Sequence, residues 1–146
     1  MRISFDIDDT LILYDNLGYT SDKLLNGEYL REGAIFLLKE LAKNHEIWIY
    51  TTSFRNPFLI KFYFWLKGVH IRKVINQDIH NKILIEYNFD KIPSKLPSHF
   101  DIDIHIDDSI GVVEEGKIFG FKVIHIKPNQ ENWKEFMLNK IENNDR

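Results

Sequence analysis

Short apolar runs alternate along the chain with longer segments in which apolar residues recur at helical spacing. Near-continuous apolar runs are typical of strands that are buried on both faces. Such runs predict five strands, at residues 3–5, 46–50, 70–75, 102–106 and 122–126. Because strands that alternate with helices favour a parallel sheet covered on both faces, we expect an α/β fold.

Helical periodicity predicts helices at residues 32–43, 57–67 and 132–142, and a short one at 110–115. Pro57 suits the first turn of its helix, whereas Gly116 and Gly120 suit turns. Between residues 76 and 100, Pro93 and Pro97 argue against long regular elements. Residues 11–30 form an irregular excursion that contains two glycines.

The length of 146 residues is enough for one domain with its own core, and 44% of the residues are hydrophobic. We therefore expect a single domain over residues 1–146. The net charge of −3 gives no basic footprint, so stable nucleic-acid binding is not expected.

The chain contains no cysteine, which excludes disulfides, zinc–thiolate sites and thiol nucleophiles. The N-terminus lacks the form of a signal peptide. The most apolar stretch, residues 58–66, is far shorter than the roughly 20 residues that a membrane-spanning helix needs. We expect a cytoplasmic protein without membrane attachment.

Two acidic clusters follow predicted strands. Asp6 and Asp8 follow the first strand, and Asp107 and Asp108 follow the fourth. Clustered carboxylates repel one another unless a cation lies between them, and Mg²⁺ prefers oxygen ligands. Because ligands of open α/β sheets gather at the carboxyl ends of the strands, all four aspartates are predicted metal ligands. The clusters also point to phosphate chemistry.

The two carboxylates of the first cluster have complementary predicted roles. A carboxylate such as Asp6 can attack phosphorus and form an acyl phosphate. A second one, Asp8, can protonate the leaving oxygen and later deprotonate water, while Thr10 hydrogen-bonds back to hold the loop. An Asp-rich turn or a calcium loop would show the same pattern, and Asp107-Asp108 would also suit a surface turn or a helix cap.

A phosphoryl group also needs donors and a cation. Thr51 ends the second strand and is the predicted phosphate contact, with Thr52 as the alternative. Helix capping, for which Ser53 alone would suffice, is the competing interpretation. Lys82, Lys91 and Lys95 all precede Asp107, and we choose Lys95 because it is closest and lies between two prolines. Arg55 follows this segment and is interpreted as a surface residue that could contact substrate.

These motifs resemble those of the haloacid dehalogenase (HAD) superfamily, whose members are mostly Mg²⁺-dependent phosphatases. The matching segments, in the family's order, are Asp6-Ile7-Asp8-Asp9-Thr10, Ile47-Trp48-Ile49-Tyr50-Thr51, Lys95 and Ile104-His105-Ile106-Asp107-Asp108. The resemblance implies a Rossmann-like three-layer fold with a central parallel sheet in the order 5-4-1-2-3.

The resemblance also implies a role for each residue. Asp6 would be the nucleophile and a metal ligand, and Asp8 the general acid/base that offers its backbone carbonyl to Mg²⁺. Asp108 would bind the metal directly, and Asp107 would assist it or orient it through water. Thr51 and Lys95 would hold the transferred phosphoryl group.

Residues 11–30 and 76–100 are too short for typical HAD cap domains. The resemblance therefore implies a capless or minimally capped HAD-like domain, with a short cap or flap at about 11–30. The predicted function is Mg²⁺-dependent phosphomonoester hydrolysis through an aspartyl-phosphate on Asp6, with a small-molecule or macromolecular substrate.

Two alternatives to this function are a phosphoryl-accepting signalling module and a non-catalytic binding protein with the same fold. In receiver domains the phosphoacceptor follows the third strand, and the order of the acidic clusters here disfavours that class. Residues 58–66 are apolar nearly all round. Core packing is the first interpretation of this helix, and an oligomer surface is the second.

Overall fold

The computed structural model describes residues 1–14, 19–23, 27–87 and 91–144. Its central sheet has five parallel strands in the order β5-β4-β1-β6-β7. These strands are β1 (Arg2–Phe5), β4 (Glu46–Tyr50), β5 (Ile71–Ile75), β6 (Ile104–Asp107) and β7 (Val123–His125). Read from the β7 edge, this is the predicted order 5-4-1-2-3, so the α/β fold is confirmed.

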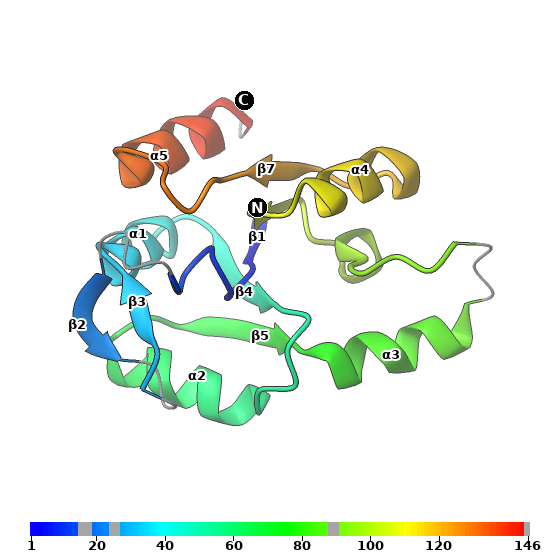
Figure 1. Cartoon of the computed structure of the whole chain (residues 1–146), viewed down its shortest axis with the longest axis horizontal. Coiled ribbons are helices and arrows are strands. Elements are labelled where there is room, and N and C mark those ends of the chain that lie inside the picture. Colours follow the sequence, from blue (N-terminus) through cyan, green and yellow to red (C-terminus); the bar gives the residue numbers. More distant parts are fainter. Residues whose placement is uncertain (15–18, 24–26, 88–90, 145–146) are drawn as a thin grey trace.

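Helices cover both faces of this sheet (Figure 1). On one face lie α1 (Ala34–Leu41), α2 (Pro57–Leu66) and α5 (Trp133–Asn144). On the other lie α3 (Gln77–Glu86), the short 3₁₀ helix η1 (Pro97–Phe100) and α4 (Ile110–Phe119). The result is a three-layer sandwich with β1 in the middle of the sheet.

The alternation of side chains along each strand divides the core between the two faces. Ile3 and Phe5 of β1 join the larger cluster, which also contains buried residues of α1, α2 and α5. On β4, Trp48 and Tyr50 belong to a separate cluster on the face of α3 and η1. Fully burying an aliphatic or aromatic side chain contributes about 1.5–3 kcal/mol, so both faces stabilise the sheet.

The prediction of no long regular element at 76–100 is wrong, because α3 occupies the first part of this segment. The side chain of Asn76 caps the helix by accepting a hydrogen bond from the backbone N–H of Ile79 (3.1 Å). Both prolines follow the end of α3, and Pro97 begins η1, so neither interrupts a helix.

The prediction of a turn at Gly116 is also wrong. Helix α4 continues through Gly116 to Phe119 and ends at Gly120, whose φ of 74° suits a glycine cap. A Cβ on Gly116 would lie 2.7 Å from the carbonyl oxygen of Phe121. Glycine is therefore required at this position for close packing of the helix against the chain that enters β7.

An antiparallel pair of strands, β2 (Tyr19–Lys23) and β3 (Tyr29–Arg31), lies in the excursion before α1. Arg31 is buried and donates hydrogen bonds to the carbonyls of Lys127 (3.1 Å) and Gln130 (3.3 Å). Its guanidinium lies 4.5 Å from the ring centroid of Trp133. These contacts tie β3 to the segment between β7 and α5.

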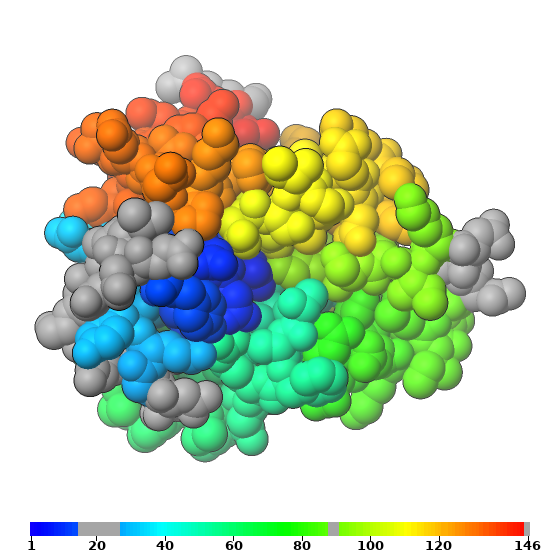
Figure 2. Space-filling model, in the orientation of Figure 1, coloured from blue at the N-terminus to red at the C-terminus, as the bar shows by residue number. Residues whose placement is uncertain are grey.

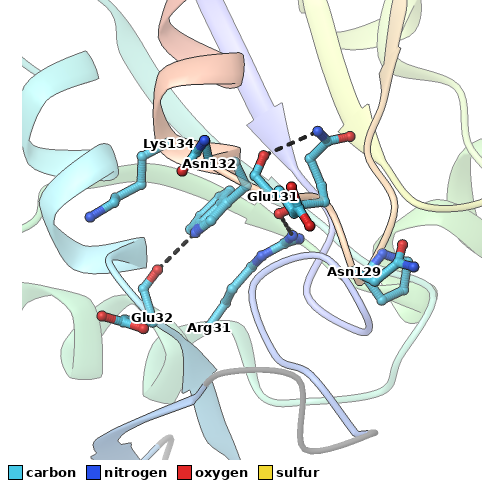
Figure 3. Close-up of a pocket in the computed structure, with 9 residues that line it drawn as sticks. Arg31, Glu32, Asn129, Glu131, Asn132 and Lys134 are labelled. Carbon is cyan, nitrogen blue, oxygen red and sulfur yellow. Dashed lines mark hydrogen bonds between the residues drawn. The ribbon is translucent and has the colours of Figure 1, made fainter.

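A pocket of about 420 Å³ lies beside Arg31 and the start of α5 (Figure 3). Its lining includes the side chains of Glu32, Glu131 and Lys134, and none of the predicted site residues. Burial lowers the pKa of Arg31 to about 10, so the guanidinium keeps its charge at neutral pH. Among the described segments, no helix combines the length and apolar composition that crossing a membrane requires.

Candidate active site

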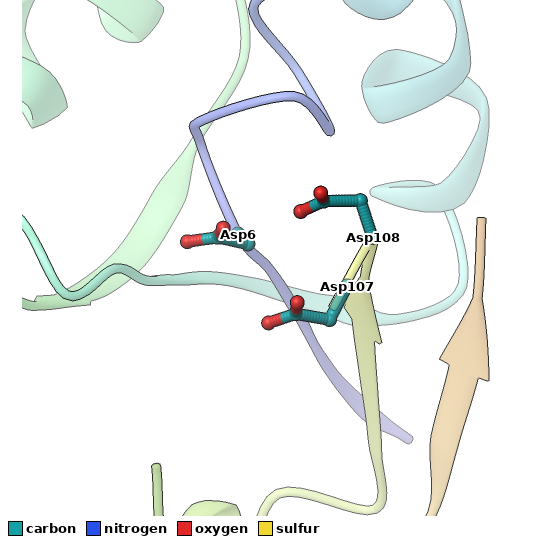
Figure 4. Close-up of side chains that lie close together, drawn as sticks. All are labelled: Asp6, Asp107 and Asp108. Atoms are coloured by element: carbon teal, nitrogen blue, oxygen red, sulfur yellow. The ribbon is translucent and has the colours of Figure 1, made fainter. Parts of the chain in front are cut away.

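Three predicted site residues meet at the carboxyl edge of the sheet. Asp6 follows β1, while Asp107 ends the neighbouring strand β6 and Asp108 comes next. One carboxylate oxygen from each of the three lies within 4.8 Å of the others (Figure 4). The adjacency of β1 and β6 produces this convergence, and the backbone N–H of Asp6 donates to the carbonyl of Ile106 (2.9 Å).

The segments that follow β1, β4 and β6 lie side by side on one face of the molecule (Figure 2). In Figure 2, the segment that includes β1 and its following loop (blue) lies between the segments after β4 (turquoise) and after β6 (yellow). Three stretches that are distant in sequence therefore surround the same region.

Lys95 lies within the acidic cluster. Its Nζ is 2.9 Å from Oδ1 of Asp6 and also forms an ion pair with Oδ2 of Asp107. The residue is 1% exposed, whereas Lys82 and Lys91, the two other candidate lysines, are exposed. The structure thus brings Lys95 together with the predicted nucleophile.

One ammonium group does not balance three carboxylates. Burial raises the pKa of Asp6 to about 6, and the charge of Asp107 adds to this effect while Lys95 opposes it. Burial and the charge of Asp107 also raise the pKa of Asp108. The excess negative charge and the all-oxygen donor set fit a hard divalent cation such as Mg²⁺, which Asp6, Asp107 and Asp108 would hold.

Hydrogen bonds fix the orientation of Asp107. It accepts one from Nε2 of His105 (2.9 Å) and one from the backbone N–H of Ser109 (2.8 Å). Burial would raise its pKa, but the His105 hydrogen bond and the charge of Lys95 hold the pKa well below its usual range. Burial lowers the pKa of His105 to about 4, so this histidine is neutral and Nδ1 accepts from the hydroxyl of Ser4 (2.7 Å).

Glu115 of α4 fixes the backbone at Lys95. Its carboxylate accepts hydrogen bonds from the backbone N–H (2.9 Å) and hydroxyl (2.7 Å) of Ser94, and from the backbone N–H of Lys95 (3.4 Å). The sequence gives no local signal for this contact, because the residues come from different elements.

Tyr50 and His80 fix the same loop from the other side. The Tyr50 hydroxyl oxygen accepts from the backbone N–H of Leu96 (2.9 Å) and lies 2.6 Å from Nδ1 of His80. Nε2 of His80 lies 3.0 Å from the carbonyl of Pro93, so this nitrogen carries the proton and Nδ1 accepts from Tyr50. The backbone is therefore anchored both before and after Lys95.

Asp8 has a different environment from the other predicted acids. Arg55 donates to both of its carboxylate oxygens (2.9 and 2.8 Å), and the hydroxyl of Tyr14 donates to one of them (2.6 Å). Arg55 also binds Glu28 (2.7 Å). Burial would raise the pKa of Asp8, but the hydrogen bonds from Arg55 and Tyr14 lower it below its usual value. Asp8 is therefore an ionised, paired carboxylate in this structure.

The environment of Arg55 corrects its sequence interpretation. Rather than lying on an open surface, its side chain is mostly buried between Asp8 and Glu28. The available signal was its position just after Thr51, at the carboxyl edge of the sheet, but the sequence did not indicate which acid it would pair with.

Thr51 lies at the carboxyl end of β4, the strand beside β1, and is buried. Its hydroxyl oxygen accepts from the backbone N–H of Ser53 (3.2 Å). Thr52, the alternative phosphate contact, is exposed. Asn56 caps α2 by accepting from the backbone N–H of Phe58 (2.9 Å), so the idea that Ser53 provides this cap is wrong.

The prediction that Thr10 hydrogen-bonds back to hold the loop is wrong as well. Its hydroxyl oxygen is buried and has no hydrogen-bond partner within the described residues. The loop after β1 is instead closed by backbone hydrogen bonds from Leu11 (2.9 Å) and Ile12 (2.8 Å) to the carbonyl of Ile7.

Known proteins resemble this chain in structure rather than in sequence. No protein-family model and no curated protein matches it. A solved structure described as a predicted HAD-like family hydrolase from Porphyromonas gingivalis aligns with a TM-score of 0.53 at 13% identity, over 96% of this chain and 97% of that one. A hypothetical protein from Xanthomonas campestris aligns with a TM-score of 0.43 at 15% identity, over 90% of this chain and 66% of that one. The sheet order and the first of these alignments identify the fold of this chain as HAD-like.

Proposed function

We propose that the chain is a Mg²⁺-dependent phosphomonoester hydrolase that acts through an aspartyl-phosphate on Asp6. The observation that carries this proposal is the convergence of Asp6, Asp107 and Asp108, of which Asp6 and Asp107 pair with the buried ammonium of Lys95. The HAD-like fold supports it, because the cluster lies at the carboxyl edge, where ligands of open α/β sheets bind.

In the proposed first step, a carboxylate oxygen of Asp6 attacks phosphorus while the bond from phosphorus to the ester oxygen breaks. With a pKa of about 6, Asp6 is mostly ionised at neutral pH, as a nucleophile must be. Mg²⁺ held by the three aspartates and the backbone carbonyl of Asp8 would supply positive charge beside the phosphoryl oxygens. Lys95 and Thr51 would contact those oxygens.

In the proposed second step, Asp8 takes a proton from a water molecule whose oxygen attacks phosphorus. The bond between Asp6 and phosphorus breaks, inorganic phosphate leaves, and Asp6 is regenerated. Asp8 thereby regains the proton that it gave to the leaving alcohol in the first step.

In this proposal, Asp8 is paired with Arg55 in the enzyme before substrate binds. An acid that protonates the leaving group must first take up a proton, and the Arg55 pair disfavours the protonated form. The anionic phosphate ester would compete for Arg55, and weakening the pair would allow Asp8 to be protonated. Arg55, which the sequence already suggested as a residue that could contact substrate, is thus proposed as a substrate contact beside Thr51 and Lys95.

We propose a chemical class of substrate, phosphate monoesters, rather than one compound. A short flap at about 11–30, rather than a cap domain, would leave the site open to a phosphorylated small molecule or macromolecule. We also keep the cytoplasm as the proposed compartment.

The proposed function is tested by hydrolysis of p-nitrophenyl phosphate with and without Mg²⁺. We expect Mg²⁺-dependent turnover that Asp6→Asn lowers by at least about 1,000-fold, since a nucleophile is removed. Asp78→Asn, which changes an exposed carboxylate on α3, is the matched control and should leave the rate unchanged. Equal rates for the wild type and Asp6→Asn would reject the assigned nucleophile.

Two other results would favour the alternative functions. Mg²⁺ binding without turnover across a broad panel of phosphate esters would indicate a binding protein. A long-lived phosphoaspartate without a released product would indicate a signalling module.

A further inference from the structure

Helix α2 carries an apolar surface that the rest of the described chain leaves exposed. Five large side chains of this helix form it and are each between 42% and 71% exposed. These residues are Phe58, Leu59, Phe62, Trp65 and Leu66, and we call them the α2 surface. The opposite side of the helix, with Ile60 and Phe64, is buried in the core, so α2 is apolar on both sides.

The α2 surface contains no charged residue. The one charged residue within the helix, Lys61, donates from Nζ to the backbone carbonyl of Arg72 (3.2 Å) and is thereby directed toward β5. Three of the rings form a continuous row: the centroids of Phe58 and Phe62 are 6.3 Å apart, and those of Phe62 and Trp65 are 6.0 Å apart. A preformed row of rings loses little side-chain entropy on docking.

The exposed area is comparable with one side of a protein interface. With roughly 200 Å² for a fully exposed aromatic side chain, the exposed fractions give the α2 surface on the order of 600 Å². Phe54, 67% exposed just before the helix, adds apolar area. A stable interface buries about 800 Å² per partner around an apolar centre, so the surface supplies most of one.

The order of residues on α2 favours a second copy of the same chain as the partner. Counting from Phe62, Leu59 and Trp65 lie three residues to either side, and Phe58 and Leu66 lie four residues to either side. A two-fold axis through Phe62 would pack two α2 helices antiparallel, with Phe58 opposite the partner's Leu66 and Leu59 opposite the partner's Trp65. The four contacts that flank the axis would then each pair a ring with a leucine, and Phe62 would pack against the partner's Phe62 at the axis, so the contacts are reciprocal, as in a self-complementary interface.

We propose that the chain forms a homodimer through antiparallel packing of α2 against α2 of a second copy. Because the α2 surface carries no charge, two copies of it can pack together without like-charge repulsion. The interface also adjoins the segment 51–56, which carries Thr51 and Arg55, so dimerisation would support the loop beside the acidic cluster.

Sedimentation velocity over a range of protein concentrations tests the dimer. We expect the wild type to sediment as a dimer at about 50 µM, and Phe62→Glu as a monomer, because it would place two carboxylates at the axis of a desolvated interface. Ile85→Glu is the matched control: Ile85 is 85% exposed on α3, outside the α2 surface, and this variant should remain dimeric. Circular dichroism checks the folding of each variant, and Trp65→Glu replaces Phe62→Glu if that variant does not fold.

Cross-linking tests the geometry separately, since the chain has no cysteine of its own. Phe62→Cys should give a covalent dimer with a short bis-maleimide, and Ile85→Cys should not. A wild type that is monomeric at every concentration would overturn the proposal, as would a dimer that Phe62→Glu leaves intact. A monomer that pellets with phosphatidylcholine–phosphatidylserine vesicles would instead assign the surface to membranes, and would equally overturn it.

Discussion

At the scale of single residues, Lys95 supplies the positive charge that lets Asp6 and Asp107 lie together in a buried site. Its ammonium is enclosed between these carboxylates, so removing it leaves them buried without an opposite charge. Such losses are larger than those of surface ion pairs, because water cannot solvate the remaining charge.

Lys95→Met should therefore lower the free energy of unfolding by about 3–5 kcal/mol at pH 7 without Mg²⁺. Urea denaturation measures this loss. Lys82→Met removes an exposed lysine on α3 and should change the unfolding free energy by less than about 0.5 kcal/mol. Equal effects of the two substitutions would contradict the charge balance described for the site.

His80 gives the protein a dependence of stability on pH. Burial lowers its pKa below the ordinary value of 6.5, and a proton on Nδ1 would displace the hydrogen bond from Tyr50. The unfolded chain takes up this proton as the pH falls below 6.5 while the native state does not, so stability falls in that direction.

Thermal unfolding at pH 7 and pH 5 measures the effect of His80. In His80→Asn, whose amide oxygen can still accept from Tyr50, the loss of stability between these two pH values should be smaller than in the wild type. His105 remains in both proteins, so the difference between them reports on His80 alone. A loss of equal size in both would show that His80 does not titrate as described.

At the scale of elements, loops are positioned by contacts from other elements. Glu115 of α4 holds three donors of the segment that carries Lys95. We therefore expect Glu115 to determine where the Lys95 ammonium lies without being needed for the fold. A displacement of a catalytic group by about 1 Å can lower the rate by as much as 100-fold.

Glu115→Ala should lower kcat/KM for p-nitrophenyl phosphate by about 10- to 100-fold with a smaller change in stability. Glu115→Gln, which keeps an oxygen acceptor, should recover part of the activity. Glu114→Ala, next along the helix and paired only with Lys117 among the described residues, is the control and should match the wild type. An unchanged rate for Glu115→Ala would remove its positioning role.

Elements with a strong local pattern could be predicted from the sequence, and those that depend on distant contacts could not. The apolar run of β4 predicted that strand to its last residue. Helix α3 was not predicted because Pro93 and Pro97 were taken as evidence against regular structure over the whole of residues 76–100. Both prolines in fact follow the helix. Gly116 was assigned to a turn because its close contact with Phe121 is invisible in sequence.

The same distinction applies to the candidate site. Asp6, Asp107 and Asp108 follow strands that the pattern identifies, and the order of a parallel sheet brings these strand ends together. The pairing of Arg55 with Asp8 joins loops that share no local pattern, so the sequence alone did not reveal it.

At the scale of the whole molecule, Mg²⁺ binding should be coupled to folding. The metal would neutralise carboxylates that the native state holds together and the unfolded chain does not, so it would stabilise only the folded protein. At a free concentration 100 times its dissociation constant, Mg²⁺ would add about 2.7 kcal/mol to the free energy of unfolding.

Thermal unfolding with and without Mg²⁺ measures this stabilisation. Asp108→Asn should reduce the Mg²⁺-dependent increase in melting temperature, since it replaces a charged ligand of the cluster. Asp78→Asn, which changes an exposed carboxylate on α3, should retain the full increase. An increase of equal size in all three proteins would place the metal elsewhere.

The proposed function depends above all on transfer of the phosphoryl group to Asp6 during turnover. Rapid acid quenching of the wild type with a phosphate ester and Mg²⁺, followed by peptic digestion in acid and mass spectrometry, tests this transfer, because an acyl phosphate hydrolyses at the alkaline pH of a tryptic digest. We predict one added phosphoryl group on the peptide that contains Asp6, at Asp6, in the wild type and none in Asp6→Asn. Turnover with a phosphoryl group on another residue, or with no phosphorylated peptide at any quench time, would contradict the claim.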